Sequence, residues 1–225
     1  MVITLSTEHD PMETSMIEVY AFATPNSVKV PIALEELGLP YDLRAVNVRK
    51  GEQKQEAFLS LNPNGKVPVL VDDGFVLTES AAILVYLAEK TGKLLPTGGA
   101  ARARVFEQLF FHASALSPAF GNAGFFKRSS PEPQPIAEAR FTSEAERILG
   151  LLDSRLSTQA FMAGDAFTIA DIAHFGWLWR RQFPGLTLDG HPNLSRWYEA
   201  VAERPAVQRA IVRVEALVET PASAA

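Results

Sequence analysis

The stretch SLNPNGKVPVLVDDGFVLTESAAILVYLAEK, residues 60–90, combines a hairpin with the start of a helix. The Asp-Asp-Gly sequence at 72–74 is typical of a hairpin turn, and it separates the apolar runs 67–71 and 75–77. After the polar Thr-Glu-Ser segment at 78–80, apolar residues recur at helical spacing. The first turn of a helix presents unpaired N–H groups and a partial positive charge. We therefore expect a hairpin that leads into an anion-binding helix.

Pro68 interrupts the first of these predicted strands. Proline has no N–H for a ladder, so it is tolerated on an edge strand or at a special site. The residues leave two conformations open. One is a trans proline on an edge strand, which is favoured because only about 5–6% of X–Pro bonds in folded proteins are cis. The other is a cis bond between Val67 and Pro68, which turns the N–H and C=O of Val67 outward, toward the backbone of a ligand.

The segments before this stretch predict a β-α-β unit. Residues 17–23 are rich in β-formers, residues 28–37 show helical spacing, and residues 41–48 are typical of a second strand. A strand, a helix and a strand in this succession predict a parallel pair. With a short helical turn at 56–61 and the opening stretch, the order becomes β-α-β-α-β-β-α, which is the thioredoxin-like arrangement.

Beyond the linker 92–99, the strand signals disappear. A proline-rich break at 129–135 interrupts a series of segments with helical spacing. These segments are 100–117, 136–156, 168–183, 192–204 and 206–218. We therefore predict an α/β plus all-α fold, with a thioredoxin-like N-terminal domain followed by an all-helical C-terminal domain. The predicted parts are a flexible extension (1–15), the thioredoxin-like domain (16–91), the linker (92–99), the all-helical domain (100–219) and a flexible tail (220–225).

One local signal in the helical half has a clear folding role. Thr168 stands three residues before Asp171 at the start of a predicted helix, which is the spacing of a capping box. Phe167 and Ile172 supply the matching hydrophobic staple. Such a cap stabilises a protein by about 0.5–2 kcal/mol. A catalytic Asp171 is the alternative, and the folding role is favoured.

The composition excludes several kinds of function. The chain has no cysteine, so any sulfur chemistry needs a sulfur that arrives with a ligand. The four histidines show no metal-ligand spacing, and we expect no metal site. A net charge of −5 argues against a nucleic-acid partner, and no apolar run is long enough for a membrane span. Residues 1–15 lack the pattern of a secretory signal, so we expect a cytoplasmic protein with no membrane partner.

Residues 60–90 resemble the glutathione-binding segment of the cytosolic glutathione transferases. In that family a cis-proline follows the residue whose backbone pairs with the cysteinyl unit of glutathione, and a Glu-Ser pair at a helix start holds the γ-glutamyl group. The resemblance therefore implies a cis Pro68 and glutathione-binding roles for Val67, Pro68, Glu79 and Ser80. It also implies that glutathione is the cosubstrate and that the protein is a homodimer.

The Thr-Pro-Asn-Ser turn at 24–27 resembles the turn where Nu-class bacterial transferases activate the thiol. Phe22 stands where the tyrosine-type enzymes carry their tyrosine. A free thiol has a pKa near 8.5, so hydrogen bonds from the Thr24 hydroxyl and the Asn26 amide, together with a helix dipole, would favour the thiolate. We therefore expect Thr24 and Asn26 to be catalytic. The alternative is that both are merely turn and capping residues.

Further site residues follow from the resemblance alone. Gln53 matches a glutamine that holds the glycyl end of glutathione, Lys66 stands near the glycyl carboxylate, and Arg140 matches an arginine that reaches over the thiol. Lys66 and Arg140 also fit a plain solvated role. Aromatic residues of the helical half are candidates to line an apolar pocket for the second substrate. They are Phe106, Phe110, Phe120, Phe125, Phe126 and Trp177.

These features predict a glutathione transferase, closest to the Nu class, that activates glutathione as a thiolate for attack on a disulfide or a hydrophobic electrophile. The Nu-class resemblance implies that oxidised glutathione or two glutathiones bind, and that disulfide reductase activity can exceed transferase activity. Two alternatives stay open. One is a non-catalytic binding or regulatory protein, although such proteins often lose the Glu-Ser pair or the turn, and both are present here. The other is a glutathione-dependent isomerase or dehalogenase.

Overall fold

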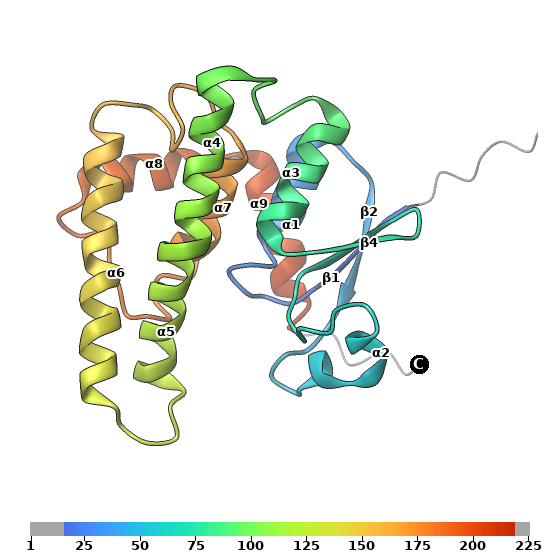
Figure 1. Ribbon diagram of the computed structural model, residues 1–225, viewed down its shortest axis with the longest axis horizontal. Helices are drawn as coiled ribbons and strands as arrows, with labels where there is room; N and C mark the ends of the chain where they lie inside the picture. The colour runs from blue at the N-terminus through green and yellow to red at the C-terminus, as the bar shows by residue number, and fades with distance from the viewer. Residues whose placement is uncertain (1–15, 219–225) are drawn as a thin grey trace, which may run out of the picture.

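The computed structural model describes residues 16–218, and a four-stranded sheet lies beside a group of long helices (Figure 1). The predicted flexible segments 1–15 and 220–225 lie outside the described residues. The predicted order β-α-β-α-β-β-α is confirmed, with one additional 3₁₀ turn at Glu52–Lys54. The elements of this half are β1 (Ile17–Ala21), α1 (Lys29–Leu37), β2 (Tyr41–Ala45), α2 (Glu56–Leu59), β3 (Val69–Asp72), β4 (Phe75–Thr78) and α3 (Ser80–Thr91).

The strands are ordered β2-β1-β3-β4 in the sheet. β1 and β2 are parallel, as predicted, whereas β3 runs antiparallel to both β1 and β4. The hairpin turn has Asp73 at φ 50° and Gly74 at φ 78°, the left-handed backbone that two-residue hairpin turns require. The bond between Val67 and Pro68 is cis, as the family resemblance implied and contrary to the trans edge-strand alternative. Pro68 lies just before β3, an inner strand, and therefore occupies no position in the ladder.

Side chains alternate between the two faces of the sheet. Val19 of β1 and Leu70 of β3 join the main core, which α1 and α3 cover. On the opposite face, Phe58 of α2 packs with Val69 and the partly buried Tyr20. The sheet is therefore sandwiched, with the larger apolar layer facing the helical half of the chain (Figure 1).

In residues 99–218 every element of secondary structure is a helix, apart from an isolated bridge between Phe161 and Gly164, and the first helix, α4, begins at the last residue of the predicted linker. We expected one helix at 100–117, but the helical segment extends further. After α4 the chain continues through a π-helical turn, His112–Leu116, directly into α5, a helix that the sequence did not predict. Pro118 in the first turn of α5 and glycines within it hide the helical pattern. The elements are α4 (Gly99–Phe111), α5 (Ser117–Arg128), α6 (Pro135–Leu156), α7 (Ile169–Trp179), α8 (Pro192–Ala202) and α9 (Pro205–Ala216).

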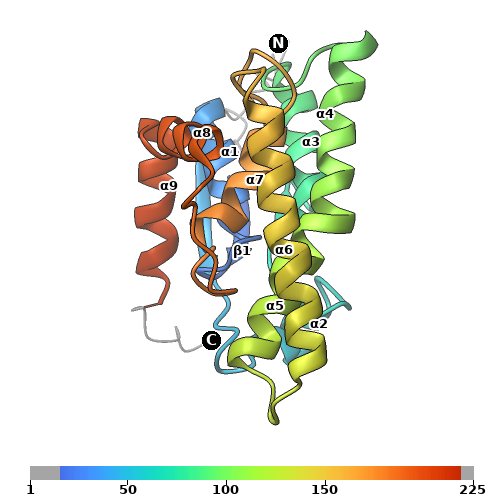
Figure 2. The same ribbon diagram turned by 90° about the vertical axis from the view of Figure 1, so that its left-hand side faces the viewer.

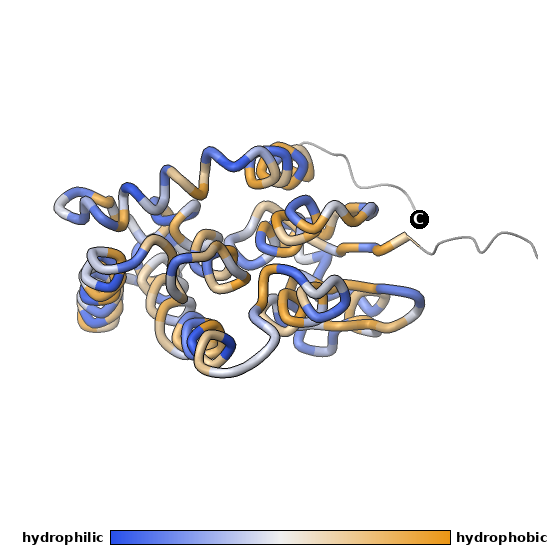
Figure 3. Tube along the Cα trace, turned by 90° about the horizontal axis from the view of Figure 1, so that it is seen from above, coloured by the Kyte–Doolittle hydropathy of each residue, from blue (hydrophilic) through white to orange (hydrophobic). Residues whose placement is uncertain are grey.

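α7 is the central helix of the molecule. It packs against α1 and α3 of the sheet half and against α4 and α8 of the helical half (Figure 2). Every residue of α7 except its last is buried, so other parts of the molecule surround the helix on all sides. The outer helices instead carry hydrophilic and hydrophobic residues in alternation along their length (Figure 3). None of the helices in residues 16–218 is long and apolar enough to cross a membrane.

The predicted capping box starts α7. The Thr168 hydroxyl accepts the N–H of Ala170 at 3.2 Å, and the Asp171 carboxylate accepts the N–H of Thr168 at 2.9 Å. The same carboxylate accepts the N–H of Met162 at 2.8 Å and the indole N–H of Trp197 at 2.9 Å. Asp171 therefore fixes the start of α7 to the preceding loop and to α8, which is a folding role.

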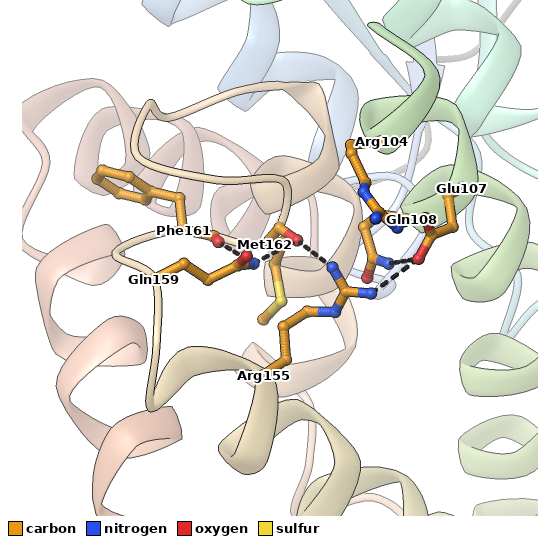
Figure 4. A network of polar contacts seen from close by, with 7 residues as sticks. All are labelled: Arg104, Glu107, Gln108, Arg155, Gln159, Phe161 and Met162. Atoms are coloured by element: carbon orange, nitrogen blue, oxygen red, sulfur yellow. Dashed lines mark hydrogen bonds and ion pairs between the residues drawn. The ribbon is translucent and has the colours of Figure 1, made fainter. Parts of the chain in front are cut away.

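A polar network holds this preceding loop from the other side (Figure 4). The Arg155 guanidinium on α6 pairs with Glu107 on α4 at 2.8 Å and donates to the Met162 carbonyl at 3.3 Å. The Gln159 amide donates to the carbonyls of Phe161 and Met162 at 2.7 and 2.9 Å. Through Met162, the network connects α4 and α6 to Asp171 and hence to α7.

Candidate functional site

The turn between β1 and α1 is fixed by its own hydroxyl groups. The Thr24 hydroxyl accepts the N–H of Ser27 at 3.1 Å, and the two hydroxyl oxygens lie 2.9 Å apart. Ser27 is buried and also accepts the N–H of Phe22 at 3.4 Å. The Thr24 hydroxyl donates its hydrogen to Ser27 Oγ, so this hydrogen is used within the turn. Thr24 therefore has the turn role, and it can donate to a ligand only by releasing Ser27.

Lys29, at the start of α1, determines how the Asn26 amide is oriented. Its Nζ lies 2.7 Å from Asn26 Oδ1, and nitrogen can only donate to that oxygen. The amide NH₂ of Asn26 therefore points away from Lys29. The same Nζ lies 3.4 Å from the Ser80 hydroxyl on α3 and 2.8 Å from His112 Nε2. One buried nitrogen thus connects the turn, α3 and the π-helical segment.

The groups around Lys29 are uncharged or positive, apart from one carboxylate. Burial lowers the pKa of Lys29 far below its ordinary value, and the nearby Glu79 opposes that shift. Burial also lowers the pKa of His112 strongly, with smaller contributions from Lys29 and His174. The rings of His112 and His174 lie 5.7 Å apart. We conclude that both histidines are neutral at pH 7.

A pocket of about 120 Å³ opens beside Asn26. Six of the nine predicted site residues line it, and the turn, the β3 entrance and the α3 start supply them. They are Asn26, Lys66, Val67, Pro68, Glu79 and Ser80. His112 and Ser117 line the opposite side, and they were not predicted. The pocket therefore lies between the sheet half and the helical half.

The start of α3 has an unusual backbone. Glu79 adopts φ 64° and ψ 107°, a region that non-glycine residues rarely occupy. This places Glu79 immediately before α3, with Ser80 as its first residue, and no side chain caps the N–H groups of that first turn. The predicted hairpin and the predicted start of the helix are thus confirmed. Glu79 and Ser80 both line the small pocket.

The loop that leads to Pro68 is stabilised by Asn62. The Asn62 amide donates to the Lys66 carbonyl at 2.6 Å, and its oxygen accepts the N–H of Asn64 at 3.0 Å. Gly65 lies so close to the Gln53 carbonyl that a Cβ there would approach it to 3.2 Å. Gln53 therefore neighbours this loop without lining the small pocket. Its Oε1 is buried and accepts no hydrogen bond within residues 16–218.

A larger pocket, of about 760 Å³, lies on the other side of the turn. Thr24 and Pro25 line it, together with Trp177 near the end of α7. Among the aromatic residues proposed for a second-substrate pocket, Trp177 is thus well placed. Phe120 is instead buried in the core, and Phe110 is largely exposed at 68%.

Arg140 does not join the other predicted residues. It is exposed on α6 and lines a separate hollow with Ile136 and Phe141. That the Arg140 side chain reaches over the thiol of a bound glutathione stays a prediction.

α7 supports the turn by close approach of its backbone. A Cβ on Gly176 would lie 2.1 Å from the Pro25 carbonyl oxygen and 2.9 Å from Lys29 Cε. Any larger residue at 176 would displace the turn. Sequence reasoning missed Lys29, although a lysine three residues after Asn26, within an otherwise apolar helix start, was a visible signal.

Comparison with known proteins gives the family. The model of the glutathione S-transferase N-terminal domain matches residues 23–90, and that of the C-terminal domain matches residues 116–205. The chain belongs to the glutathione transferase family. The disulfide-bond oxidoreductase YfcG of Escherichia coli is 36% identical over 209 residues, which cover 89% of this chain and 96% of YfcG.

Solved structures agree with this assignment. A glutathione transferase family member from Pseudomonas fluorescens, solved with two glutathiones bound, superimposes with a TM-score of 0.83 at 36% identity, over 89% of this chain and 94% of that chain. A glutathione transferase from Pseudomonas putida was solved with one glutathione disulfide bound per subunit. It superimposes with a TM-score of 0.83 at 34% identity, over 89% of this chain and 93% of that chain. The predicted thioredoxin-like and all-helical fold is confirmed. Within residues 16–218, no cluster of three His, Cys, Asp or Glu could hold a metal ion.

We predict that His174 weakens the fold in acid. Burial lowers its pKa from 6.5 to about 4. Between these values the unfolded chain binds a proton that the native chain does not, so the free energy of unfolding falls as the pH drops below about 6.5. The full effect is roughly 3 kcal/mol. Urea unfolding at a series of pH values should therefore give a flatter acid limb for His174→Phe than for the wild type. Parallel curves would show that His174 does not titrate in this way.

Proposed function

We propose that the chain binds glutathione in the small pocket and activates it as a thiolate, acting mainly as a glutathione-dependent disulfide reductase of the Nu class. The observation that carries this proposal is the Lys29–Asn26 contact. Because Asn26 Oδ1 is held at 2.7 Å by Lys29, the amide NH₂ is the group left to face a ligand in the pocket. An N–H donor at that place favours a sulfur anion over a neutral thiol.

The pocket suits the shape of the tripeptide. The γ-glutamyl end is proposed to bind at Glu79 and Ser80, where the unpaired N–H groups of α3 attract a carboxylate. The cysteinyl backbone would pair with Val67, which precedes the cis Pro68. The glycyl end would extend toward Lys66 and Gln53. This orientation directs the thiol toward the turn that holds Asn26.

The chemistry needs no protein base. A shift of about two pKa units, roughly 2.7 kcal/mol, makes the thiolate the dominant form at pH 7. The donors proposed for it are the Asn26 amide and the Thr24 hydroxyl. The thiolate then attacks one sulfur of a disulfide, a new S–S bond forms, and the other sulfur leaves as a thiolate. A second glutathione thiolate releases the product thiol and gives oxidised glutathione.

The relatives support this choice of reaction over simple transfer to an electrophile. YfcG carries the name disulfide-bond oxidoreductase, and the two Pseudomonas structures hold two glutathiones or one glutathione disulfide. A small pocket beside a larger one agrees with such an arrangement. A reductase that has no disulfide of its own also fits a cytoplasmic location.

We expect the double variant Thr24→Ala, Asn26→Ala to lose about a hundredfold in disulfide reduction, which corresponds to the two-unit shift of the thiol pKa. Its free energy of unfolding should change by no more than about 2 kcal/mol, the usual limit for a lost cap. Steady-state reduction of hydroxyethyl disulfide by glutathione and urea unfolding would measure the two quantities.

The matched control is Thr158→Ala with Asn122→Ala. Asn122 donates to the Pro118 carbonyl within α5, and Thr158, just after α6, donates to the Arg155 carbonyl. Both residues lie outside the two pockets and should leave the rate unchanged. Full activity in the Thr24→Ala, Asn26→Ala variant would contradict the catalytic role proposed for these two residues. Retention of the wild type on immobilised glutathione without turnover of any substrate would favour a binding protein instead.

We expect Lys29→Met to raise the pKa of bound glutathione by about one unit, because the Asn26 amide loses the donor that orients it. The ultraviolet absorbance of the thiolate, followed against pH in the binary complex, measures that pKa directly. A merely structural lysine would alter stability and leave the pKa in place. An unchanged thiol pKa in a folded variant would therefore contradict the positioning role.

A homodimer is the proposed assembly. Two large apolar side chains, Phe75 on β4 and Phe110 on α4, are 51% and 68% exposed, so a second copy has apolar surface to cover. Light scattering on the purified chain should give twice the 24.6 kDa mass of one copy. A value equal to one copy would contradict the proposal.

A further inference from the structure

The larger pocket combines aromatic walls with positive charge. Its walls come from the turn after β1, the segment after β2, the end of α5 and the end of α7. The aromatic residues are Phe22, Trp177, Trp179 and Phe183. Three arginines, Arg49, Arg128 and Arg180, line the same pocket, and none of its lining residues is acidic. This is a local reversal of charge in a chain whose net charge is −5.

Arg180 is held at the rim by stacking. Its guanidinium carbon lies 3.8 Å from the centre of the Trp179 ring, and it donates to the Ala23 carbonyl at 3.4 Å. Its nearest carboxylate partner, Glu215, is 3.8 Å away, beyond hydrogen-bond range. Burial lowers the pKa of Arg180, Glu215 opposes the shift, and Arg49 adds to it. Two guanidinium groups therefore repel each other across the pocket.

The other two arginines have no carboxylate partner among the described residues, whereas Arg180 has a distant one in Glu215. Within residues 16–218, Arg49 forms no ion pair, and its guanidinium lies 5.8 Å from the Phe22 ring centre. Arg128 donates to two backbone carbonyls, those of Phe183 at 2.6 Å and Gln182 at 2.8 Å. These contacts position the Arg128 guanidinium without a counter-charge. An anion in the pocket would relieve the repulsion.

We propose that this pocket binds the second substrate and that the substrate is a carboxylate-bearing organic disulfide, with its carboxylate at Arg49 and Arg180. This inference rests on the proposed disulfide reduction. A guanidinium matches a carboxylate with two parallel hydrogen bonds, and the aromatic walls cover the apolar body of the ligand. The sequence predicted an apolar pocket for the second substrate, and it gave no signal for the arginines, which come from loop and helix ends.

The position of the pocket connects it to the thiol. Thr24 and Pro25 line the larger pocket, and Asn26 lines the small one, so the same turn borders both. A disulfide held by its carboxylate at the arginines has its sulfur atoms near this turn. The glutathione thiolate forms the new S–S bond there, and the leaving sulfur departs with the electron pair of the broken bond and takes a proton from water.

Two disulfides with the same two-carbon spacer between sulfur and the polar group test the proposal. Dithiodipropionate carries two carboxylates, whereas hydroxyethyl disulfide carries none. At saturating glutathione, the wild type should have the higher kcat/KM for dithiodipropionate. In the Arg49→Gln, Arg180→Gln variant, the ratio of kcat/KM for dithiodipropionate to kcat/KM for hydroxyethyl disulfide should fall by about tenfold or more. The change should come from a higher KM for the dianion, because its bidentate charge-assisted pairs are lost.

Arg181→Gln is the matched control. Arg181 follows Arg180 directly, but it donates to the Leu178 carbonyl at 2.9 Å and lies over the Tyr198 ring, outside the larger pocket. The Arg181→Gln variant should have the same ratio of the two kcat/KM values as the wild type. A wild type without preference for the dianion, or a double variant with an unchanged ratio, would overturn the proposal.

A binding measurement separates this proposal from the proposed reaction. Trp177 and Trp179 line the pocket, so their fluorescence reports occupancy without turnover. If neither disulfide is reduced, the proposed function fails, and quenching by dithiodipropionate but not by hydroxyethyl disulfide still supports the anion site. Equal quenching by both would overturn it. Arg49→Gln alone, at an exposed loop position, provides a second variant if the double variant does not fold.

Discussion

The site depends on one hydrogen bond between a buried nitrogen and an amide oxygen, from Lys29 Nζ to Asn26 Oδ1 at 2.7 Å. An asparagine amide has two ends of similar shape, one donating and one accepting, and a pocket proposed to stabilise an anion needs the donating end. The Lys29 nitrogen donates to the amide oxygen, which leaves the NH₂ end outside this contact. The cost is a desolvated nitrogen in the core, offset by the Ser80 hydroxyl and His112.

The rest of the molecule keeps that nitrogen buried. Gly176 lets the backbone of α7 reach the turn, since a Cβ there would collide with the Pro25 carbonyl. α7 in turn starts at the carboxylate of Asp171, and Asp171 holds the Met162 N–H. Met162 is tied to α4 and α6 through Arg155. The helical half therefore supports the proposed active-site turn and also forms a wall of the pockets.

Local signals were predictable because they depend on neighbouring residues. The hairpin, the parallel β-α-β unit and the Thr168 cap follow from turn chemistry, periodicity and spacing. The cis Pro68 needed the family resemblance, because base rates alone favour trans. α5 was missed since proline and glycine within it resemble a break. Lys29 carried a local signal that was missed, whereas the arginine pocket could not be predicted, because its shape arises from segments distant in sequence.

Charge explains why the two pockets differ although one turn separates them. The lining of the small pocket carries one acidic residue, Glu79, and one lysine, Lys66, so negative and positive groups are balanced around a proposed zwitterionic peptide. In the larger pocket, three arginines have no acidic neighbour in the lining. A thiolate formed at Asn26 would lie between a balanced site and a positive one. In the proposed reaction the positive side would favour both the thiolate and an anionic disulfide, so a single arrangement of charge would activate the nucleophile and select its target.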